Sequence, residues 1–418
     1  MIWAAPDRSS GVAENRSPFA PVEGAAAAAG NVSNSRDSAR PQRGDSSRRL
    51  VALFTELAGV GGVQEASRLT AAALVDIASC RHWSTDFLSL NDPPGVHALP
   101  SPFEKISFRG FGRAKVRFSR SALGLARNPT RIVLAGHPYL ALPAVQLKLL
   151  NPKLKVIVVS HGVEVWKRLP VLRRLAFRRA DLFLAPSRYT VDKIVEVHHI
   201  AAAKTRRVAW PVNPILLEMA RRGELPPVPA RFPDGLILLA VARLVTKERY
   251  KGVDQLIRAV AQLAPRHPSL QLVVVGRGDD LERHQGLATG LGIASRVQFF
   301  DNISTAETAA CYSRCDVFAL PSTGEGFGLV FLEAMAFGKP VVGAAAGGVS
   351  DIIEHGQNGL LVPAGDLDEL IGMLERLLMS ESLRLSLGRT GAQMVRSRYS
   401  FDTFRSDLER VLGDCGLA

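Results

Sequence analysis

Short apolar runs that alternate with segments of helical spacing are the feature that most constrains this fold. From Leu50 the runs are RLVALF, RIVLAG, KVIVVS and DLFLAPS. After residue 235 they resume as LILLAVA, LQLVVVG, RVQFF, DVFALPS and KPVVGAA. Continuous apolar runs of this length are typical of parallel strands that helices cover on both faces. The sequence therefore predicts two α/β units, each with a doubly wound parallel sheet.

Composition sets the expected boundaries of these units. Residues 1–47 are rich in Ala, Ser, Gly, Pro and Arg without apolar periodicity, so we expect a disordered tail there. The proline-rich stretch GELPPVPARFPDG predicts a linker at 223–235, since proline disfavours packed elements. The first domain then spans 48–222 and the second 236–398. A C-terminal helix is expected at 399–418, crossing back to the first domain.

The composition also excludes several classes of protein. No run of about 18 apolar residues predicts a membrane-spanning helix, and the first residues lack a secretory signal, so we expect a cytoplasmic protein. Cys80, Cys311, Cys315 and Cys415 are too scattered for a disulfide framework. Cys311 and Cys315 lie one helical turn apart, but no second pair completes a zinc site, so we interpret them as packing residues. The net charge of +13 favours an anionic partner.

The segment PSTGEGFGLVFLEAMAFGKPVVG carries the densest functional signal. A predicted strand enters a glycine-rich turn, and a helix follows from about Leu329 to Phe337. Glycines permit close backbone approach, and the free amides at a helix start favour a phosphate group. Glu325 and Glu333 would then accept hydrogen bonds from the transferred sugar and from a ribose, respectively. The alternative is an ordinary strand-to-helix turn with solvated acids near the helix dipole.

Other residues follow the neighbouring strands at the same predicted sheet edge. Arg243 ends the run LILLAVA, and Lys251-Gly252 opens the next helix, so both cations could clamp a diphosphate. Solvated surface charge is the alternative for such residues. Gly276-Arg277-Gly278 lacks the third glycine of a dinucleotide fingerprint, and we interpret Gly276 as part of a turn over a nucleotide base.

Together these residues resemble the donor domain of glycosyltransferase family 4, whose members are retaining enzymes of the GT-B fold, with two Rossmann-like domains facing across a cleft. The match runs from about Leu236 to Ser400 and includes GGVSDIIEHGQNGLLVPAGD and SRYSF. The resemblance implies that Arg243 and Lys251 hold the donor diphosphate and that Glu333 binds ribose. It also implies contacts to sugar and phosphate from the segment that comprises Glu325, Gly326, Phe327, Gly328 and Leu329.

The first half resembles the family more loosely and would bind the acceptor. Gly61-Gly62-Val63 matches the family's first glycine-rich turn, which lies under the reacting groups, so the resemblance implies that Gly61 and Gly62 contact the donor. His137 follows RIVLAG where similar enzymes place an active-site histidine. His161 and Glu164 in SHGVEVW are expected on the acceptor side. The family often has Asn-Gly-Val after the last strand of this domain, whereas this chain has AWPVNPI. His198 and His199 are interpreted as surface residues.

The resemblance implies a retaining glycosyltransferase that moves a hexose, mannose or glucose, from a nucleoside diphosphate sugar to a glycan or lipid-linked acceptor. Surface polysaccharide or glycolipid biosynthesis would be its setting. We expect no bound cofactor or divalent metal, and no protein nucleophile is evident. The alternatives are a GT-B enzyme that processes nucleotide sugars without transfer, and a non-catalytic glycan- or nucleotide-binding protein.

Two basic segments of the first half suggest a further partner. One contains Arg109, Arg113, Lys115, Arg117 and Arg120, and the other contains Lys167, Arg168, Arg173, Arg174, Arg178 and Arg179. The second is interleaved with Trp166, Leu169, Leu172, Leu175 and Phe177. This pattern suits an anionic membrane surface and suggests a peripheral location on the inner face of the cytoplasmic membrane. An ordinary amphipathic helix is the alternative, and nucleic acid is disfavoured because no binding module accompanies the charge.

Overall fold

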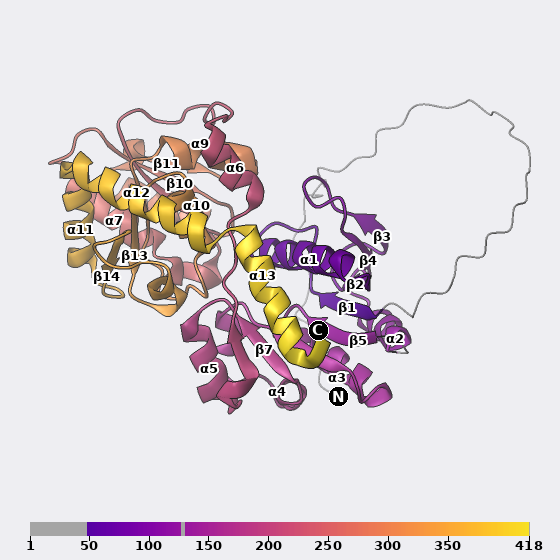
Figure 1. Ribbon diagram of the computed structural model, residues 1–418. Helices are drawn as coiled ribbons and strands as arrows, with labels where there is room; N and C mark the ends of the chain where they lie inside the picture. Colours follow the sequence, from indigo (N-terminus) through magenta and orange to yellow (C-terminus); the bar gives the residue numbers. More distant parts are fainter. Residues whose placement is uncertain (1–47, 127–129, 418) are drawn as a thin grey trace, which may run out of the picture. The chain divides into compact units, whose positions relative to one another are not determined.

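The protein is described by a computed structural model that covers residues 48–126 and 130–417. The expected tail at 1–47 lies outside the described residues. Two sheets organise the rest of the chain, and each is flanked by helices (Figure 1). The two α/β domains predicted from the apolar runs are therefore confirmed.

The first sheet has eight strands in the order β3-β4-β2-β1-β5-β6-β7-β8. All neighbouring pairs are parallel except β3 and β4. The strands are β1 (Arg49–Phe54), β2 (Ser84–Ser89), β3 (Gly95–Ala98), β4 (Ser107–Gly110), β5 (Thr130–Ala135), β6 (Lys155–Val159), β7 (Leu182–Ala185) and β8 (Thr205–Arg207). The four predicted runs form β1, β5, β6 and β7 at the centre of the sheet.

The second sheet has six strands, all parallel, in the order β11-β10-β9-β12-β13-β14. Its strands are β9 (Leu236–Val241), β10 (Leu270–Val275), β11 (Val297–Phe300), β12 (Val317–Leu320), β13 (Val341–Ala344) and β14 (Leu360–Val362). The five predicted runs form the first five of these. The edge strand β14 is three residues long and was not predicted.

Helices follow most strands, as the alternating pattern predicted. Along the chain they are α1 (Gly62–Cys80), α2 (Lys115–Leu125), α3 (Ala141–Leu150), α4 (Val171–Arg178), α5 (Arg188–His198), α6 (Pro214–Arg222), α7 (Val253–Leu263), α8 (Leu281–Gly290), α9 (Thr305–Arg314), α10 (Leu329–Ala336), α11 (Leu367–Met379), α12 (Glu381–Arg398) and α13 (Phe401–Leu412).

Burial on both faces explains why the strand sequences do not alternate between apolar and polar residues. In β9, Ile237 and Leu239 belong to one buried cluster, whereas Leu238 and Ala240 belong to another. Successive side chains of a strand point to opposite faces, so a sheet that helices cover on both sides needs apolar residues at every position.

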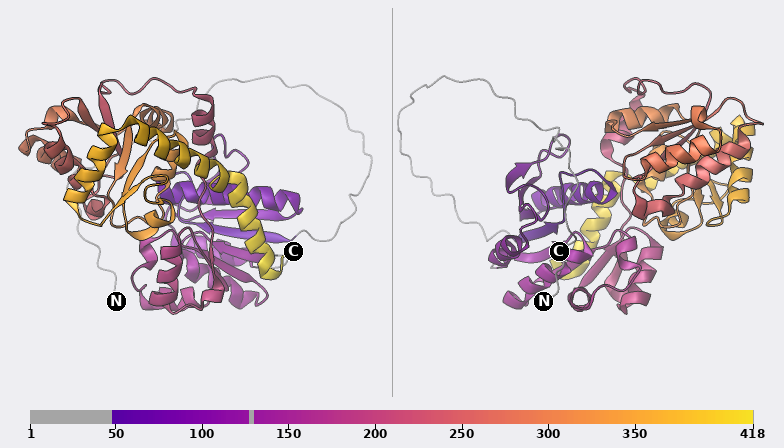
Figure 2. Two further views of the ribbon diagram at one scale, coloured as in Figure 1. Left: turned by 60° about the vertical axis from the view of Figure 1, so that its left-hand side comes forward. Right: turned by 180° about the vertical axis from the view of Figure 1, so that it is seen from behind.

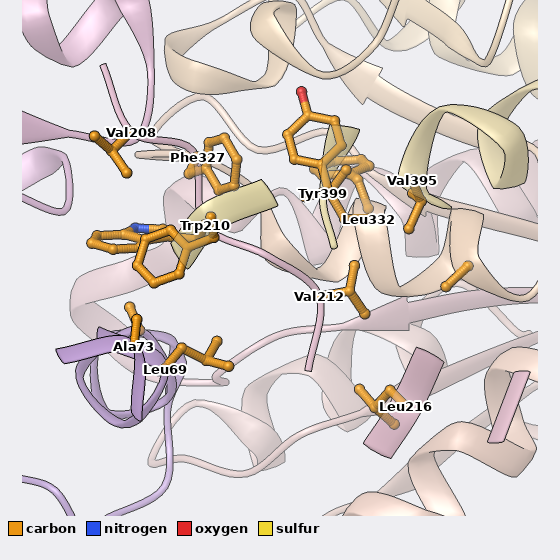
Figure 3. Packing of buried hydrophobic residues seen from close by; sticks show 14 of the residues in the cluster. Leu69, Ala73, Val208, Trp210, Val212, Leu216, Phe327, Leu332, Val395 and Tyr399 are labelled. Atoms are coloured by element: carbon orange, nitrogen blue, oxygen red, sulfur yellow. The ribbon is translucent and has the colours of Figure 1, made fainter. Parts of the chain in front are cut away.

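One of these clusters joins residues of both halves of the chain. Leu69 and Ala73 of α1 share it with Trp210, Phe327 and Tyr399 (Figure 3). The segment before α6 therefore packs with residues from the first and the second half, and it contributes apolar surface of its own to this cluster.

Helix α6 packs against helices of the second half of the chain, although the sequence placed it in the first domain. It contacts α9 and α10, and its Leu216 is buried. The stretch 223–235, where a linker is expected, contains no described helix or strand and follows α6. The spacing of apolar residues in the sequence does not reveal this packing.

The C-terminal helix returns to the first domain, as expected. Helix α12 contacts α10 and α11, and α13 contacts α1 (Figures 1 and 2). Arg81 at the end of α1 forms an ion pair with Glu409 of α13 at 3.1 Å. Arg206 of β8 pairs with Asp414 at 3.5 Å. The two ion pairs and the helix contact attach the end of the chain to its first sheet.

Candidate functional site

The glycine-rich turn between β12 and α10 forms a set of free amide donors. Gly328 adopts φ +103° directly before α10, and a Cβ at Gly326 would lie 2.3 Å from the carbonyl oxygen of His161. Only glycine therefore fits at position 326. Among the described residues, no group accepts a hydrogen bond from the amides of Gly326, Phe327 or Gly328. These donors stand at the positive end of α10, where an anion is stabilised.

Lys251 lies beside this turn, but it is already paired. Its Nζ donates to Glu325 Oε2 at 2.6 Å, and both side chains are largely buried. Burial disfavours the ammonium form, yet the attraction of Glu325 prevails and raises the pKa of Lys251. The structure thus brings two predicted site residues together as an ion pair, whereas the sequence had suggested separate partners for them.

Arg243, the second predicted cation, lies in the same β9–α7 connection as Lys251 and also has a carboxylate partner. Its guanidinium is 65% exposed and donates to Glu248, which the sequence analysis did not select. The other oxygen of Glu248 is buried without a hydrogen-bond partner among the described groups. Arg243 is therefore held at the edge of the β9–α7 connection, with most of its surface accessible.

The glycines after β10 pack on the loop that follows β9. A Cβ at Gly276 would lie 1.8 Å from the carbonyl oxygen of Ala242, and one at Gly278 would lie 1.9 Å from that of Leu244. The Leu244 amide also donates to the Arg277 carbonyl at 2.9 Å. Gly276 thus lies next to the loop that begins with Arg243.

A network of ion pairs that was not predicted from the sequence connects the loop after β9 with the loop after β10. Asp280 is 3% exposed and accepts hydrogen bonds from Arg249 at 2.8 Å and from Arg283 at 2.6 Å. Arg283 also pairs with Asp254 of α7 at 2.7 Å. The bonds from Arg283 and Arg249 hold the pKa of Asp280 well below its usual range. The available signal was the acidic pair Asp279-Asp280 directly after the glycines.

Glu333 lies inside α10 in a different environment. Its Oε2 accepts a hydrogen bond from the hydroxyl of Tyr312 at 2.8 Å. Burial raises the pKa of Glu333 to about 7, and the charge of Glu65 on α1 acts in the same direction. Near neutral pH the Glu333 carboxyl is therefore divided between its protonated and ionised forms. Neither Tyr312 nor Glu65 was singled out in the sequence, because both lie far from Glu333 along the chain.

Gly61 and Gly62 open the helix that carries Glu65. Gly61 has φ +146° and precedes α1 as its N-cap, and no neighbour lies within 4 Å of a Cβ built on Gly62. Glu65 in the first turn accepts a hydrogen bond from Asn213 Nδ2 at 2.6 Å. The predicted first glycine turn is therefore connected to the other half of the site through Glu65 rather than through a glycine contact.

His137 and His161, both predicted, lie stacked on each other. Their ring centroids are 5.9 Å apart, and His161 stacks in turn on Trp210 at 5.6 Å. Burial, followed by the charge of His161, lowers the pKa of His137 to about 4. Nδ1 of His137 accepts the Tyr139 amide at 3.2 Å. The neutral ring at physiological pH therefore carries its proton on Nε2, which can donate to a hydroxyl group.

The loop that carries His161 touches the glycine-rich turn directly. A Cβ at Gly162, which has φ +150°, would lie 2.4 Å from Cα of Gly326. The Glu164 carboxylate accepts the His161 amide at 2.5 Å, so this predicted acceptor-side residue stabilises its own loop. Ser187, which the sequence analysis did not select, donates from Oγ to the Gly326 carbonyl at 2.8 Å.

Three further expectations can be compared with the structure. His198 is buried and lies within hydrogen-bonding distance of the Val165 carbonyl, at 2.9 Å, so its assignment to the surface was wrong; His199 is exposed. The interpretation of Cys311 and Cys315 as packing residues is confirmed, since both are buried in the core. His198 packs against Phe177, a contact between separate elements that the sequence does not reveal.

The segment AWPVNPI, where the chain departs from the family pattern, makes contacts with both halves of the chain. Trp210 is buried against His161, and the Val212 amide donates to the Tyr399 carbonyl at 3.0 Å. Asn213 caps α6 through its side-chain oxygen and donates to Glu65. These contacts give the departure a structural role in the connection between the domains.

The two basic segments lie on different elements of the first domain. Arg109, Arg117 and Arg120 line a cavity of about 600 Å³ between β3, β4 and α2. The second segment includes α4, where Phe177 is buried but Val171, Leu172 and Leu175 are exposed. The described part of the chain contains no helix both long and apolar enough to cross a membrane. Nor does it bring together three His, Cys, Asp or Glu side chains that could hold a metal ion.

Comparisons with solved structures agree with this architecture. The chain superposes on sucrose-phosphate synthase of Thermosynechococcus elongatus with a TM-score of 0.71 at 24% identity, covering 88% of this chain and 98% of that one. It also superposes on HepE of Anabaena in complex with UDP, with a TM-score of 0.67 at 18% identity over 88% and 100% of the two chains. These likenesses and the two α/β domains show that the chain has the GT-B fold.

Sequence comparisons give the family. Residues 222–394 match the model of glycosyl transferases group 1. A GDP-mannose-dependent alpha-(1-6)-phosphatidylinositol monomannoside mannosyltransferase of Mycobacterium tuberculosis is 30% identical over 287 residues, which cover 64% of this chain and 74% of the relative. A D-inositol 3-phosphate glycosyltransferase of Corynebacterium jeikeium is 40% identical over 148 residues, 34% of this chain and 35% of the relative. The chain belongs to the glycosyl transferases group 1 family.

Proposed function

We propose that this glycosyltransferase moves a mannosyl group, with retention of anomeric configuration, from a nucleoside diphosphate sugar to a lipid-linked acceptor. The observation that carries the donor side is the Lys251–Glu325 pair beside three free amides at the start of α10. Mannose, rather than glucose, and guanine as the base are supported by the name of the mycobacterial relatives. Their named acceptor is a phosphatidylinositol mannoside, which supports a lipid-linked acceptor for this chain.

The donor diphosphate would take the anion position before α10. Breaking the bond between the anomeric carbon and the phosphate places extra negative charge on the leaving diphosphate, and prepositioned donors stabilise that charge. The amides of Gly326, Phe327 and Gly328 would bind one phosphate. Lys251 and Arg243 would bind the diphosphate as well, with Arg243 exchanging Glu248 for a phosphate oxygen.

The sugar and the ribose would be held by hydrogen bonds to their neutral hydroxyl groups. Glu325 would accept hydrogen bonds from hydroxyls of the transferred sugar through the oxygen that Lys251 leaves free, and His137 would donate to another hydroxyl from Nε2. Glu333 would accept from the ribose. Gly276 would lie under the base, next to the Arg243 loop.

Retention without a protein nucleophile is supported by the state of the nearby carboxylates. Glu325 is paired with Lys251, and Glu164 accepts a backbone amide, and these hydrogen bonds lower the nucleophilicity of both carboxylates. The acceptor hydroxyl would attack on the face that the phosphate leaves, with a phosphate oxygen of the leaving group receiving the proton.

Peripheral membrane contact through α4 is part of the same proposal. The exposed Val171, Leu172 and Leu175 lie among arginines on one short helix. Apolar side chains with a cationic surround favour the interface of an anionic bilayer, with about 1 kcal/mol for each cation near the surface.

The donor side can be tested by thermal stabilisation with a panel of nucleoside diphosphates and their sugars, since ligand binding raises the unfolding midpoint by mass action. We expect a shift with GDP and GDP-mannose in the wild type, and loss of most of it in Glu333→Ala and Arg243→Ala. A product anomer with the donor's configuration, determined by proton NMR, would support retention. Absence of a shift with every nucleotide would contradict the proposal, and nucleoside diphosphate release that no acceptor stimulates would favour hydrolysis of the donor.

A further inference from the structure

Arg173 of α4 lies over the ring of Tyr139, close to His137. The guanidinium carbon is 4.3 Å from the Tyr139 ring centroid, and that ring is 4.5 Å from the ring of His137 in an edge-on arrangement. Helix α4 packs against the short 3-10 turn Pro138–Leu140, which fixes the pair in place. The charge of Arg173 also contributes to the lowered pKa of His137, so the two groups share one electrostatic environment.

Arg173 has no anionic partner among the described residues, unlike three other cations near the candidate site. Lys251 pairs with Glu325, Arg243 with Glu248, and Arg249 with Asp280. No carboxylate in the described residues pairs with Arg173, whose observed contact is the face of an uncharged ring. Stacking on an aromatic ring orients a guanidinium and leaves its N–H groups free to bind a phosphate with two parallel hydrogen bonds.

The surroundings of the pair indicate what kind of molecule would reach it. Tyr139 is 46% exposed, so part of its ring is open to a ligand. Val171 and Leu172, directly before Arg173, are 62% and 72% exposed, and Leu175 follows at 55%. A phosphate at Arg173 would therefore have His137 on one side and an exposed apolar surface on the other.

We propose that Arg173 and Tyr139 form the acceptor's phosphate-binding subsite, which selects acceptors that carry a phosphate close to the hydroxyl that receives the sugar. The inference rests on the proposed function, because it assumes that transfer takes place at His137. Arg173 binds the phosphate, Tyr139 holds the guanidinium and contacts the acceptor's ring, and the exposed apolar residues of α4 contact a lipid chain where one is attached. The same chemistry serves a lipid phosphodiester and a soluble phosphate monoester.

The test compares acceptors that differ only in the phosphate. With GDP bound, the affinity for mannose 6-phosphate is compared with the affinity for mannose. In a second pair, the affinity for vesicles of phosphatidylinositol in phosphatidylcholine is compared with the affinity for vesicles of pure phosphatidylcholine. We expect the wild type to prefer the phosphate-bearing member of each pair, and Arg173→Gln to reduce that preference at least tenfold, the effect of losing a charge-assisted hydrogen bond. Tyr139→Ala should reduce it less, because the cation remains but is no longer oriented.

Arg178→Gln on the same helix is the matched control, since it removes the same charge from an exposed position. It should leave the preference for mannose 6-phosphate within twofold of wild type. Preference for the vesicles alone would assign the subsite to lipid phosphodiesters, and preference for the soluble ester alone would assign it to monoesters. Equal losses of the preference for mannose 6-phosphate in Arg173→Gln and Arg178→Gln, or a wild type without preference in either pair, would overturn the subsite.

A different measurement tests the proposed function. Thermal stabilisation by GDP, which lacks the transferred sugar, should be the same in wild type, Arg173→Gln and Tyr139→Ala, because the residues proposed to bind the diphosphate and the ribose lie on other elements. If the wild type shows no such stabilisation, the donor assignment is wrong. If stabilisation is normal and only the phosphate preference is missing, the acceptor inference alone is wrong.

Discussion

The two halves of the candidate site are built in opposite ways. In the second domain every charged residue that we place near the donor has a partner from that domain: Lys251 with Glu325, Arg243 with Glu248, and Tyr312 with Glu333. In the first domain Trp210, His161 and His137 stack on one another, Tyr139 meets His137 edge-on, and the row of rings ends at Arg173, which has no carboxylate partner among the described residues. Paired charges must exchange partners when an anion arrives, whereas a stacked cation is ready to bind one. The difference suggests a donor half that reorganises locally and an acceptor half that is oriented in advance.

Among the substitutions that test this comparison, replacing Lys251 should have the largest effect on the rate of transfer. Lys251→Ala removes a charge from the diphosphate position and leaves Glu325 buried without its partner. We expect kcat to fall by about 10² to 10³, the cost of losing one prepositioned donor in the transition state. Initial rates of nucleoside diphosphate release measure it. Lys247→Ala, an exposed residue of the same loop, is the control, and an equal loss there would contradict the assignment.

Replacing His137 probes the stacked half. His137→Phe keeps an aromatic ring against His161 but removes the Nε2 donor, so transfer should fall by about tenfold to a hundredfold. Since the pKa of His137 is lowered to about 4, the ring stays neutral above pH 5. The ratio of wild-type to variant rates should therefore be constant between pH 5.5 and 8. A ratio that changes with an apparent pKa near 6.5 would show that His137 titrates as an ordinary exposed histidine.

The pH dependence of donor affinity tests Glu333. Ribose hydroxyls donate to the ionised carboxylate, so binding favours deprotonation of a group whose pKa is raised to about 7. Affinity for GDP-mannose should rise about tenfold from pH 6 to pH 8. Glu333→Gln should bind more weakly and show no such rise when isothermal titration is repeated across the range.

The same pKa predicts how stability changes with pH. The folded-state pKa of Glu333 lies above its ordinary value, so its contribution to stability is complete below about pH 4.5 and is lost as pH rises through 7. Urea unfolding should show Glu333→Gln gaining stability relative to wild type between pH 6 and pH 8. A difference that is constant with pH would mean that Glu333 is ionised throughout.

The smallest expected effect is on donor affinity, when the ion pairs of Asp280 with Arg249 and Arg283 are weakened. Asp280→Asn weakens the bonds from Arg249 and Arg283 and should lower the free energy of unfolding by about 1–3 kcal/mol. The donor KM should rise a few-fold while kcat changes little, because Asp280 lies behind the loops rather than at the diphosphate. Urea unfolding and steady-state rates measure both, with the exposed Glu282→Gln as control.

What the sequence could predict follows from how local each feature is. Strands such as β9 were predictable because burial of both faces leaves an uninterrupted apolar run. The strands β3 and β14 were missed because β3 is mostly exposed and β14 has three residues. Lys251 and Glu325 were found from their positions after strands, but their pairing was not, since 74 residues separate them.

The partners of the site residues were the least predictable part. Tyr312 lies on a helix chosen only for its cysteines, and Asn213 stands in a segment noted for departing from the family pattern. Arg173 was counted as one of many basic residues, and only the fold places it over Tyr139. A side chain's type is visible in the sequence, whereas its partner depends on how separate elements pack.

The return of α13 to the first domain limits how such a protein could be recombined. The family match ends at residue 394, before α13 begins, and the ion pairs of Glu409 and Asp414 are made with Arg81 and Arg206 of the first half. A chimaera that takes residues 222–394 from a relative would inherit a foreign donor domain and keep both ion pairs. One that takes everything after residue 222 would join a foreign terminal helix to a native α1. New donor specificities would therefore be acquired more easily by internal exchange than by replacement of the whole second half.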